Sequence, residues 1–494
     1  MKTIFKILGA LLLLVIGIGI GKFALAPKAT ETVAPSFFDG GEANGEKSQI
    51  IQGETIEVKD GESIQAAVAK AKPGDVIMVF PGTYSETVYI DKDNIRFYGV
   101  IENGKRPTLD GKKELNDAFL YSGNGITIEN FKIVDFKGNA IMGQAGNNFI
   151  IRNNLIENTG VYGIFPQYGK NGLVELNKVS GIEDAAIYIG MCDNIDVRNN
   201  EVFESVAGIE IENSRHCLVE NNYVHDNTGG LLAFITPGLP IKDCYDVIFR
   251  ENFVINNNHD NFGAPGSVVA TIPPGTGLLV LAADEVTVED NFFIGNKSFA
   301  IAVTDLDNAE VKFSTDEGID QFPDKITILD NYMENNGYDP SGIIKKVRDL
   351  AFKKSLDIGF IGGGNNNCIL NRGRYVTLGL ESFANCEPVS TKEVKSYMLA
   401  NPVEPRDVSI KDKGKLAFYG ICAGCHSFNN QIVGPEIKAI QAIYKNNPQG
   451  IVDYINKPIH KRPDYPEMPS QKHLPEDVKQ AVAKYMLQVG NEKE

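Results

Sequence analysis

Apolar and polar residues alternate in short runs along the middle of the chain, and each run ends at an asparagine. Alternation with a period of two predicts β-strands that bury one face. The successive asparagines are separated by 24, 23, 23, 22, 30, 39 and 40 residues. The first four intervals are nearly equal, which indicates a structural repeat. The asparagines are Asn130, Asn154, Asn177, Asn200, Asn222, Asn252, Asn291 and Asn331.

A repeat of 22 to 24 residues that holds short strands separated by Asn- and Gly-containing turns predicts one coil of a right-handed parallel β-helix. The fixed LxxLxL register of a leucine-rich repeat is absent. Because coils bury their apolar residues only by stacking, we expect the asparagine side chains to form a ladder of amide hydrogen bonds along the axis. The asparagines are therefore interpreted as structural residues, in a mainly β fold.

The start of the repeat region predicts a cap. Residues 63–71 (SIQAAVAKA) form the pattern of a short amphipathic helix, and residues 76–79 that of the strand after it. Farther along, the longer intervals place enlarged loops around residues 231–242, 257–277 and 305–323. Insertions on neighbouring coils lie on one side of a solenoid and often form its binding face.

The repeat decays beyond Gly337, and two cysteines flank this exit. Cys368 and Cys386 could form a disulfide in an oxidising compartment. The remaining cysteines of the repeat region are interpreted as buried thiols. These are Cys192, Cys217 and Cys244.

Residues 74–84 (GDVIMVFPGTY), together with the asparagine repeat, resemble the entry of pectin-lyase-like β-helix proteins. The resemblance covers residues 55–385 or so and implies the fold. Proteins of this kind bind polysaccharides along a groove beside the strands, and some cleave or epimerise uronans with Asp, Lys, Arg or His. The resemblance therefore raises a polysaccharide partner and a carbohydrate-active enzyme as expectations.

Two His-Asp-Asn sequences are the candidate catalytic residues of the repeat region. His225 and Asp226 precede one enlarged loop, and His259 and Asp260 begin another. A paired His and Asp could supply a base or bind a metal. The same sequence is also a good turn, and no DPHE-like sequence of the alginate-epimerase kind is present. Arg215 and His216 form a weaker, exposed pair.

Near the C-terminus, Cys422, Cys425 and His426 form a CxxCH motif. This spacing attaches a c-type haem: both thiols add to the porphyrin vinyl groups, and the histidine supplies an axial nitrogen to the iron. The spacing suits one helical turn, which places both sulfurs on the same side of the ring edge. The motif predicts one covalently bound haem c.

The surroundings of the motif resemble class I cytochromes c over residues 408–490. A predicted helix leads into Cys422, a Gly-Pro turn follows at 434–435, and a final helix begins at Pro475. The resemblance implies His426 as proximal ligand and Met468, between prolines, as distal ligand. Thioether ligation raises the reduction potential and leaves no open position on iron, which favours electron transfer. The competing ligands are His460 and His473, both expected to face solvent, and Met486, expected in the helical core.

Composition and charge limit the class of protein. The chain has 494 residues, 43% of them hydrophobic and 23% charged, which excludes general disorder. The net charge is −16; residues 401–494 hold 13 Lys and Arg against 11 Asp and Glu, so they carry +2 and the rest −18. An acidic body disfavours nucleic acid and the anionic surface of a membrane as partners.

The N-terminus indicates export, to the periplasm or another extracytoplasmic location. Lys2 and Lys6 precede an unbroken apolar run over residues 7–21, and residues 24–26 (ALA) resemble a cleavage site. Pro27 directly after this site leaves an uncleaved anchor as an alternative, although the run is short for a membrane span.

These patterns together predict an exported electron carrier. Its β-helix would dock a redox partner protein or bind polysaccharide. The alternative is a carbohydrate-active enzyme, such as a uronan lyase or epimerase, with a redox-active cytochrome module; a purely structural β-helix is a third reading. The expected organisation is a signal peptide or anchor (1–26), a linker (27–50), a parallel β-helix (51–388), a second linker (389–407) and an all-α cytochrome c domain (408–494).

Overall fold

The computed structural model describes residues 53–265, 267–309, 316, 318–406, 412–460, 465 and 467–490. Gly53–Glu494 forms one compact unit. The predicted signal or anchor and the first predicted linker lie outside the described residues. None of the described helices is both long and apolar enough to cross a lipid bilayer.

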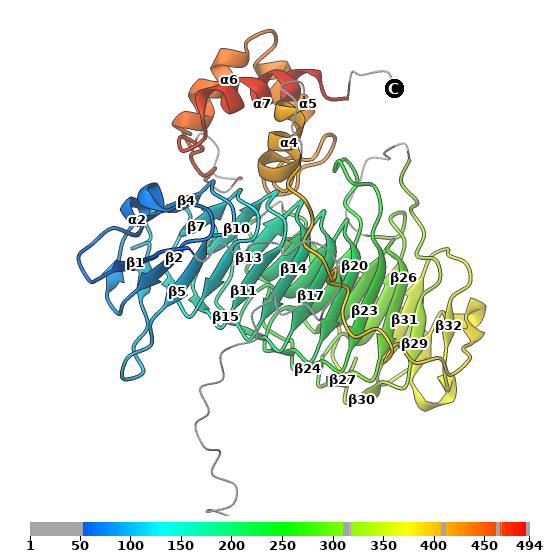
Figure 1. Ribbon diagram of the computed structural model, residues 1–494. Helices are drawn as coiled ribbons and strands as arrows, with labels where there is room; N and C mark the ends of the chain where they lie inside the picture. Colours follow the sequence, from blue (N-terminus) through cyan, green and yellow to red (C-terminus); the bar gives the residue numbers. More distant parts are fainter. Residues whose placement is uncertain are drawn as a thin grey trace, which may run out of the picture. The chain divides into compact units, whose positions relative to one another are not determined.

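Three parallel sheets, called A, B and C here, make up a parallel β-helix, and the chain visits them in turn in each coil (Figure 1). Sheet A contains β1 (Thr55–Val58), β2 (Val76–Val79), β5 (Arg96–Gly99), β8 (Thr127–Glu129), β11 (Phe149–Arg152), β14 (Lys170–Glu175), β17 (Asp193–Arg198), β20 (Arg215–Glu220), β23 (Tyr245–Arg250), β26 (Asp284–Glu289), β29 (Thr327–Leu329), β32 (Cys368–Ile369) and β34 (Ala384–Asn385). Sheet B contains β3 (Thr83–Tyr84), β6 (Thr108–Asp110), β9 (Lys132–Val134), β12 (Leu155–Glu157), β15 (Lys178–Ser180), β18 (Glu201–Phe203), β21 (Tyr223–His225), β24 (Phe253–Ile255), β27 (Phe292–Ile294) and β30 (Tyr332–Glu334). Sheet C contains β4 (Val88–Ile90), β7 (Phe119–Tyr121), β10 (Ile141–Gln144), β13 (Tyr162–Gln167), β16 (Ala185–Gly190), β19 (Ala207–Glu212), β22 (Gly229–Phe234), β25 (Thr276–Leu281), β28 (Phe299–Thr304), β31 (Ile358–Ile361) and β33 (Thr377–Leu378).

The interior of the β-helix is a set of apolar stacks, because the register between coils is constant. Val174 pairs with Val197, and Val197 with Val219, all fully buried. Each stack removes apolar surface from water, which contributes about 25 cal/mol for each Å² buried. The predicted β-helix is confirmed by this topology.

The predicted asparagine ladder is also present, at the turn between sheets A and B. Asn177 Nδ2 donates to Asn200 Oδ1 at 3.1 Å, and Asn200 Nδ2 donates to Asn222 Oδ1 at 3.0 Å. The backbone N–H of each asparagine donates to the same oxygen of the next one. The ladder satisfies amides that no water reaches. A second ladder, not foreseen, follows the turn between sheets B and C through Asn227, Asn257, Asn296 and Asn336.

The first asparagine of the repeat is misaligned by one residue. Glu129 pairs with Arg152, so Asn130 lies opposite Asn153 and not opposite Asn154. The ladder position of that coil is Phe131, whose backbone N–H donates to Asn154 Oδ1 at 3.0 Å. The alternation favours the observed register, because it pairs Ile128 with Ile151, whereas alignment of the two asparagines would place Ile128 opposite Arg152.

The predicted cap is helix α2 (Ile64–Lys70). Ser63 accepts a hydrogen bond from the Ala66 amide at its N-terminus, and Ile64, Ala67 and Val68 are buried on the first coils. The cap closes an edge that would otherwise offer unpaired backbone groups to another chain.

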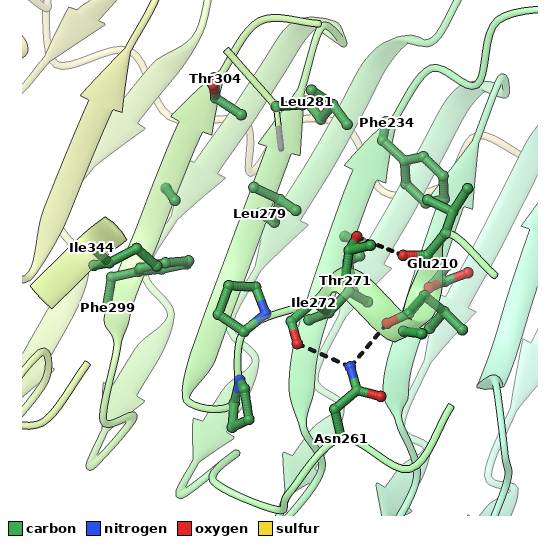
Figure 2. A pocket seen from close by; sticks show the side chains of 18 of the residues that line it. Glu210, Phe234, Asn261, Thr271, Ile272, Leu279, Leu281, Phe299, Thr304 and Ile344 are labelled. Carbon is green, nitrogen blue, oxygen red and sulfur yellow. Dashed lines mark hydrogen bonds between the residues drawn. The ribbon is translucent and has the colours of Figure 1, made fainter. Parts of the chain in front are cut away.

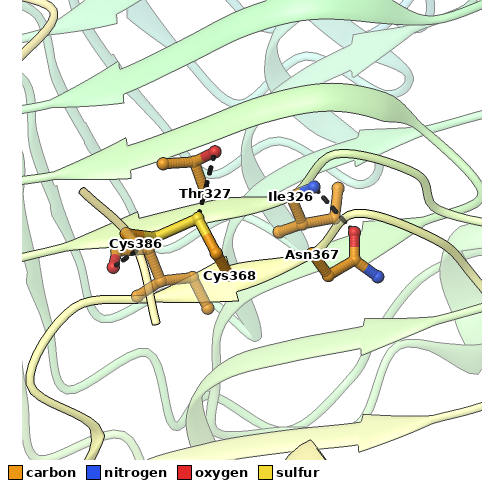
Figure 3. The surroundings of a disulfide bond; sticks show 6 residues. Ile326, Thr327, Asn367, Cys368 and Cys386 are labelled. Atoms are coloured by element: carbon orange, nitrogen blue, oxygen red, sulfur yellow. Dashed lines mark hydrogen bonds between the residues drawn. A yellow bond between two sulfur atoms is a disulfide. The ribbon is translucent and has the colours of Figure 1, made fainter. Parts of the chain in front are cut away.

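The exit contains helix α3 (Gly342–Leu350) and the 3₁₀ turns η2 (Arg372–Arg374) and η3 (Leu380–Ser382). Cys368 and Cys386 form a disulfide there, which the sequence allowed but did not determine (Figure 3). The other three cysteines of the β-helix are buried free thiols, as expected.

The C-terminal helical unit consists of the described residues of 412–490. Its elements are α4 (Lys413–Ala417), the π-helical turn η4 (Phe418–Cys422), α5 (Ile437–Ile443), α6 (Pro448–Asn456) and α7 (Glu476–Gln488). α7 crosses α4 so closely at Gly414 that a Cβ there would lie 2.4 Å from the Ala481 carbonyl oxygen. The two helices predicted on either side of the CxxCH motif are thus present and packed together.

The segment between the β-helix and the helical unit lies along sheet A, drawn in gold in Figure 1. Thr391 Oγ1 donates to Glu289, the Tyr397 amide donates to Asp196 at 2.9 Å, and the Val403 amide donates to Asn148 Oδ1 at 2.8 Å. Along this segment, the contacted residues move from the tenth strand of sheet A back to the fifth. This strap therefore carries the chain from the end of the β-helix to its middle.

We expect Asn200→Ala to lower the free energy of unfolding by about 3 kcal/mol, because it leaves buried amide and carbonyl groups on two coils without partners. Lys178→Ala, which removes an exposed ion pair with Glu201 and a cation–π contact with Phe203 on sheet B, should change it by about 1 kcal/mol or less. Denaturant unfolding followed by the β-sheet circular dichroism signal measures both. Equal midpoints for the two variants would contradict a stabilising ladder.

Candidate functional site

The CxxCH motif forms a tight turn at the end of η4. The amides of Cys425 and His426 both donate to the Cys422 carbonyl, at 3.1 and 2.9 Å. A single helical turn therefore holds the two thiols and the imidazole on adjacent positions, as the sequence predicts. Burial raises the pKa of both thiols to about 12, so they are uncharged at neutral pH.

His426 is buried, with 7% of its surface exposed, and it has a defined orientation. Its Nδ1 lies 2.8 Å from the carbonyl oxygen of Pro435. A carbonyl only accepts hydrogen bonds, so Nδ1 carries the proton and Nε2 carries the free lone pair. Burial lowers the pKa of His426 and keeps the ring neutral. Gly434 leaves room for the ring, since a Cβ there would lie 2.4 Å from Cε1.

A neutral imidazole whose other nitrogen is held by a carbonyl is the usual form of a metal-ligating histidine. Two thiols and such an imidazole on one turn fit the donor set that a covalent haem requires. Met468 is half-buried and packs on the apolar cluster that also contains Cys422, Phe418 and Ile437. A soft thioether thus lies in the same apolar region as the turn.

The competing ligands have different environments. Met486 is 5% exposed and belongs to the helical core, as expected. His460 is exposed, as expected, and its Nε2 lies 2.8 Å from the Tyr465 carbonyl oxygen. His473 differs from the expectation, because its ring packs 4.6 Å from that of Tyr89 in sheet C. Its Nε2 is shielded from solvent without a partner among the described residues, and burial lowers its pKa to about 4.

The CxxCH turn lies on the outer face of sheet C. Gln167 Nε2 donates to the Tyr419 carbonyl at 2.5 Å, and Ser427 Oγ donates to the Pro237 carbonyl at 3.0 Å. A Cβ on Gly424 would lie 2.6 Å from the ring of Phe165. The β-helix therefore forms part of the wall around the turn, an arrangement that the sequence does not reveal.

A cavity of about 450 Å³, the acid cavity, adjoins the same face of sheet C. Figure 2 shows Glu210 and Phe234 on one side of it and Phe299 and Ile344 on the other. Its walls are mostly apolar. The loop in front is held by Asn261, whose Nδ2 donates to the carbonyls of Val269 and Ile272 at 3.0 and 2.9 Å. From the helical unit, the cavity is lined by Gly424, Ile432 and Val433.

Three carboxyl groups line the acid cavity: Asp184, Glu210 and Glu212. Burial raises the pKa of Glu210 to about 8 and that of Glu212 to about 7, and raises the pKa of Asp184 well above its usual range. Glu212 accepts a hydrogen bond from Thr236 through one oxygen. Its other oxygen is buried and has no partner among the described residues.

These three acids are not among the candidate residues that the sequence pattern indicates. Glu210 and Glu212 alternate with Ile209 and Ile211 on β19, which is the pattern of polar residues facing solvent. The available signal was the apolar residues at the same positions of neighbouring coils, since Glu210 pairs with Tyr188 and Leu232. Apolar residues on the outer face indicate that something covers it.

The predicted His-Asp pairs do not converge on the acid cavity. His225 Nδ1 lies 2.8 Å from the Asp226 carboxylate, and its ring stacks on Tyr223 at 4.0 Å on the outer face of sheet B. His259 Nδ1 lies 2.7 Å from the backbone oxygen of Asp260, not from its carboxylate.

His259 lines a second cavity, of about 680 Å³, with Lys113, Lys137 and Glu183. Burial raises the pKa of Glu183. The weaker pair also has a structural explanation, because His216 Nδ1 lies 2.7 Å from Asp193 on the neighbouring coil and His216 is half-buried. No group of three or more His, Cys, Asp or Glu among the described residues forms a metal site of the protein's own.

The β-helix is the part of the chain that resembles known proteins. The family model for a right-handed β-helix region matches residues 113–236. Together with the three parallel sheets, this match supports a right-handed parallel β-helix. It does not bear on the helical unit. No curated protein matches the chain.

Three solved structures illustrate the fold. The alginate lyase from Paenibacillus sp. str. FPU-7 is 12% identical, with a TM-score of 0.42 over 63% of this chain and 99% of that one. The A-module of the mannuronan C-5 epimerase AlgE4 from Azotobacter vinelandii is 13% identical, with a TM-score of 0.34 over 63% and 88%. DFA-IIIase from Arthrobacter chlorophenolicus A6, in complex with GF2, is 14% identical, with a TM-score of 0.44 over 68% and 99%.

We expect the protein to lose stability as the pH rises from the unfolded pKa of 4.5 to the folded pKa values of about 7 and 8. The folded-state pKa values of Glu210 and Glu212 are raised, so their stabilising contribution is full below the unfolded pKa and is lost above the folded one. Glu210→Gln should reduce this loss between pH 5 and 9 by roughly 3 to 5 kcal/mol. Glu157→Gln, on the outer face of sheet B, should leave the pH profile unchanged. Urea unfolding at each pH measures the effect, and identical profiles would contradict burial of Glu210 in its neutral form.

Proposed function

We propose that this protein is an exported monohaem c-type cytochrome that transfers electrons, with its β-helix as the scaffold of the haem unit. The observation that carries the proposal is the buried His426. Its Nδ1 is held by the Pro435 carbonyl, and its Nε2 lone pair is free, beside Cys422 and Cys425 on one turn. A histidine in this state has no evident structural function in a turn, and it is suited to bind iron.

The residues of this chain would hold the haem in defined ways. Cys422 and Cys425 would form the thioether bonds, His426 would bind the iron through Nε2, and Met468 would be the sixth ligand. The bound haem supplies a one-electron iron couple. The apolar cluster of the helical unit and the outer face of sheet C would exclude water from the ring and so raise the reduction potential.

The acceptor or donor is proposed to be a redox partner protein in the periplasm, with the β-helix as a docking or polysaccharide-binding surface. Export suits this assignment, because covalent haem attachment accompanies secretion. The direct test is expression in cells that mature c-type cytochromes. We expect a reduced-minus-oxidised spectrum of haem c and a mass increase of one haem, both lost in the Cys422→Ala, Cys425→Ala double variant. A colourless wild-type protein without added mass would refute the proposal.

We expect Met468→Ala to abolish the weak thioether-to-iron charge-transfer band and to lower the potential by on the order of 100 mV, because the axial ligand sets the potential. Redox titration with near-infrared absorbance measures both. Met486→Ala is the matched control, which should keep the band and cost about 2 to 4 kcal/mol of stability through a core cavity. His473→Ala should also keep the band. Loss of the band in either control, with retention in Met468→Ala, would reassign the sixth ligand.

A second candidate function is a carbohydrate-active enzyme of the uronan lyase or epimerase kind. The observation that favours it is the second cavity, where His259 lies with Lys113 and Lys137. The Lys113 ammonium could bind the carboxylate of a uronic acid, and a histidine could abstract the proton beside it. Lys137 pairs with Glu467 at 3.1 Å and would have to exchange that partner to contribute. Glu183 and Glu204 also line this cavity, so the candidate function rests on His259 and Lys113 and not on the net charge of the cavity.

If this second function operates, His259→Ala should reduce lyase activity on alginate or polygalacturonate at least about 100-fold, as loss of a general base does. The formation of unsaturated products, followed by ultraviolet absorbance, measures the activity. His225→Ala is the control, since His225 lies on the outer face of sheet B and outside this cavity. Absence of product from every uronan tested, with the wild-type protein, would exclude the lyase.

A further inference from the structure

The acid cavity holds acidic groups without a basic partner. Its lining includes Asp184, Glu210 and Glu212, but no Lys, Arg or His among the described residues. The two glutamates are 3% and 4% exposed, so water does not compensate them. A carboxyl group that is buried without a cation is costly in either state, because ionisation is opposed by burial and the neutral acid still needs hydrogen-bond partners.

The carboxyl of Glu212 adds an independent observation. One oxygen accepts from Thr236, whereas the other is buried and has no partner among the described residues. Buried polar atoms are nearly always paired, and an exception indicates a missing partner. Since Glu212 lines the cavity, that partner would be a molecule that occupies it.

The other residues that line the cavity indicate the size and the apolar character of such a molecule. Tyr188 and Phe234 lie beside the acids, and Leu279 and Phe299 belong to the farther wall. A volume of about 450 Å³ is within the range of small-molecule sites, roughly 300 to 1,000 Å³. Aromatic faces attract cations as well as apolar groups.

We propose that the acid cavity binds a small organic cation, with a primary ammonium group at Glu210 and Glu212 and an apolar or aromatic body along the rest of the wall. The ammonium has three donors, enough for both carboxylates. An anionic ligand such as a uronate has no cationic partner there. The site does not depend on the haem, but Gly424, in the CxxCH motif, and Val433 form part of its wall. A bound cation would therefore lie beside the proposed haem.

The test is calorimetric titration of the purified full-length protein with three probes of one shape: benzylammonium, benzyl alcohol and benzoate. We expect benzylammonium to bind at least ten-fold more tightly than benzyl alcohol, and benzoate not to bind. Glu210→Gln and Glu212→Gln should each weaken benzylammonium binding at least ten-fold. Glu157→Gln on sheet B should not change it. Circular dichroism confirms that each variant folds.

The proposal is overturned if benzyl alcohol binds as tightly as benzylammonium, if benzylammonium gives no binding at millimolar concentrations, or if the two glutamine variants bind like the wild type. A neutral sugar that binds the cavity in place of the cation would also overturn it. The result is separable from the haem assignment, since colour and mass report the haem and calorimetry reports the cavity. A colourless protein that binds benzylammonium would refute only the cytochrome.

Discussion

The stacking of coils in constant register is the constraint on which the rest of this structure depends. A single coil cannot bury its apolar residues or satisfy its turn amides, and each ladder asparagine bonds to the coil beside it. Once the register is constant, equivalent positions of successive strands lie in line on the outer faces as well as in the interior. Residues of similar size, charge or apolarity at one outward position of each strand then form a continuous surface along the axis.

The outer face of sheet C shows this effect. Leu120, Met142, Phe165 and Tyr188 occupy outward positions on neighbouring coils, yet they are only 0 to 4% exposed. The helical unit and the enlarged loops cover them. Glu210 shares this covered face, and therefore a residue in a position that usually faces water becomes a buried acid. The acid cavity and the CxxCH turn both lie on this covered outer face of sheet C.

The fold was largely predictable from the sequence, because each coil of a β-helix repeats the same pattern of residues at a regular interval. The alternation, the asparagine spacing and the cap at residues 63–71 each have a local physical cause, and each is present. The one-residue misalignment of Asn130 arose because the asparagines were aligned with one another, although the alternation pairs Ile128 with Ile151 and so places Asn130 opposite Asn153. The CxxCH turn was also predictable, since its chemistry depends on residues four positions apart. The buried environment of His473 was not, because Tyr89, on which it packs, is 384 residues away in the chain.

The strap explains why sequence reasoning could not place the helical unit. A segment between two folded parts is ordinarily a spacer, and its composition gives no sign of its course. Here its amides and side chains bond to Glu289, Asp196 and Asn148, which lie on the tenth strand of sheet A, on the seventh and just before the fifth. These bonds return the chain to the middle of the β-helix, so the CxxCH turn meets sheet C at β13 and not at the C-terminal end of the β-helix. Polar residues on the outer face of sheet A thus determine where the CxxCH turn meets sheet C. This dependence arises only when the chain is folded.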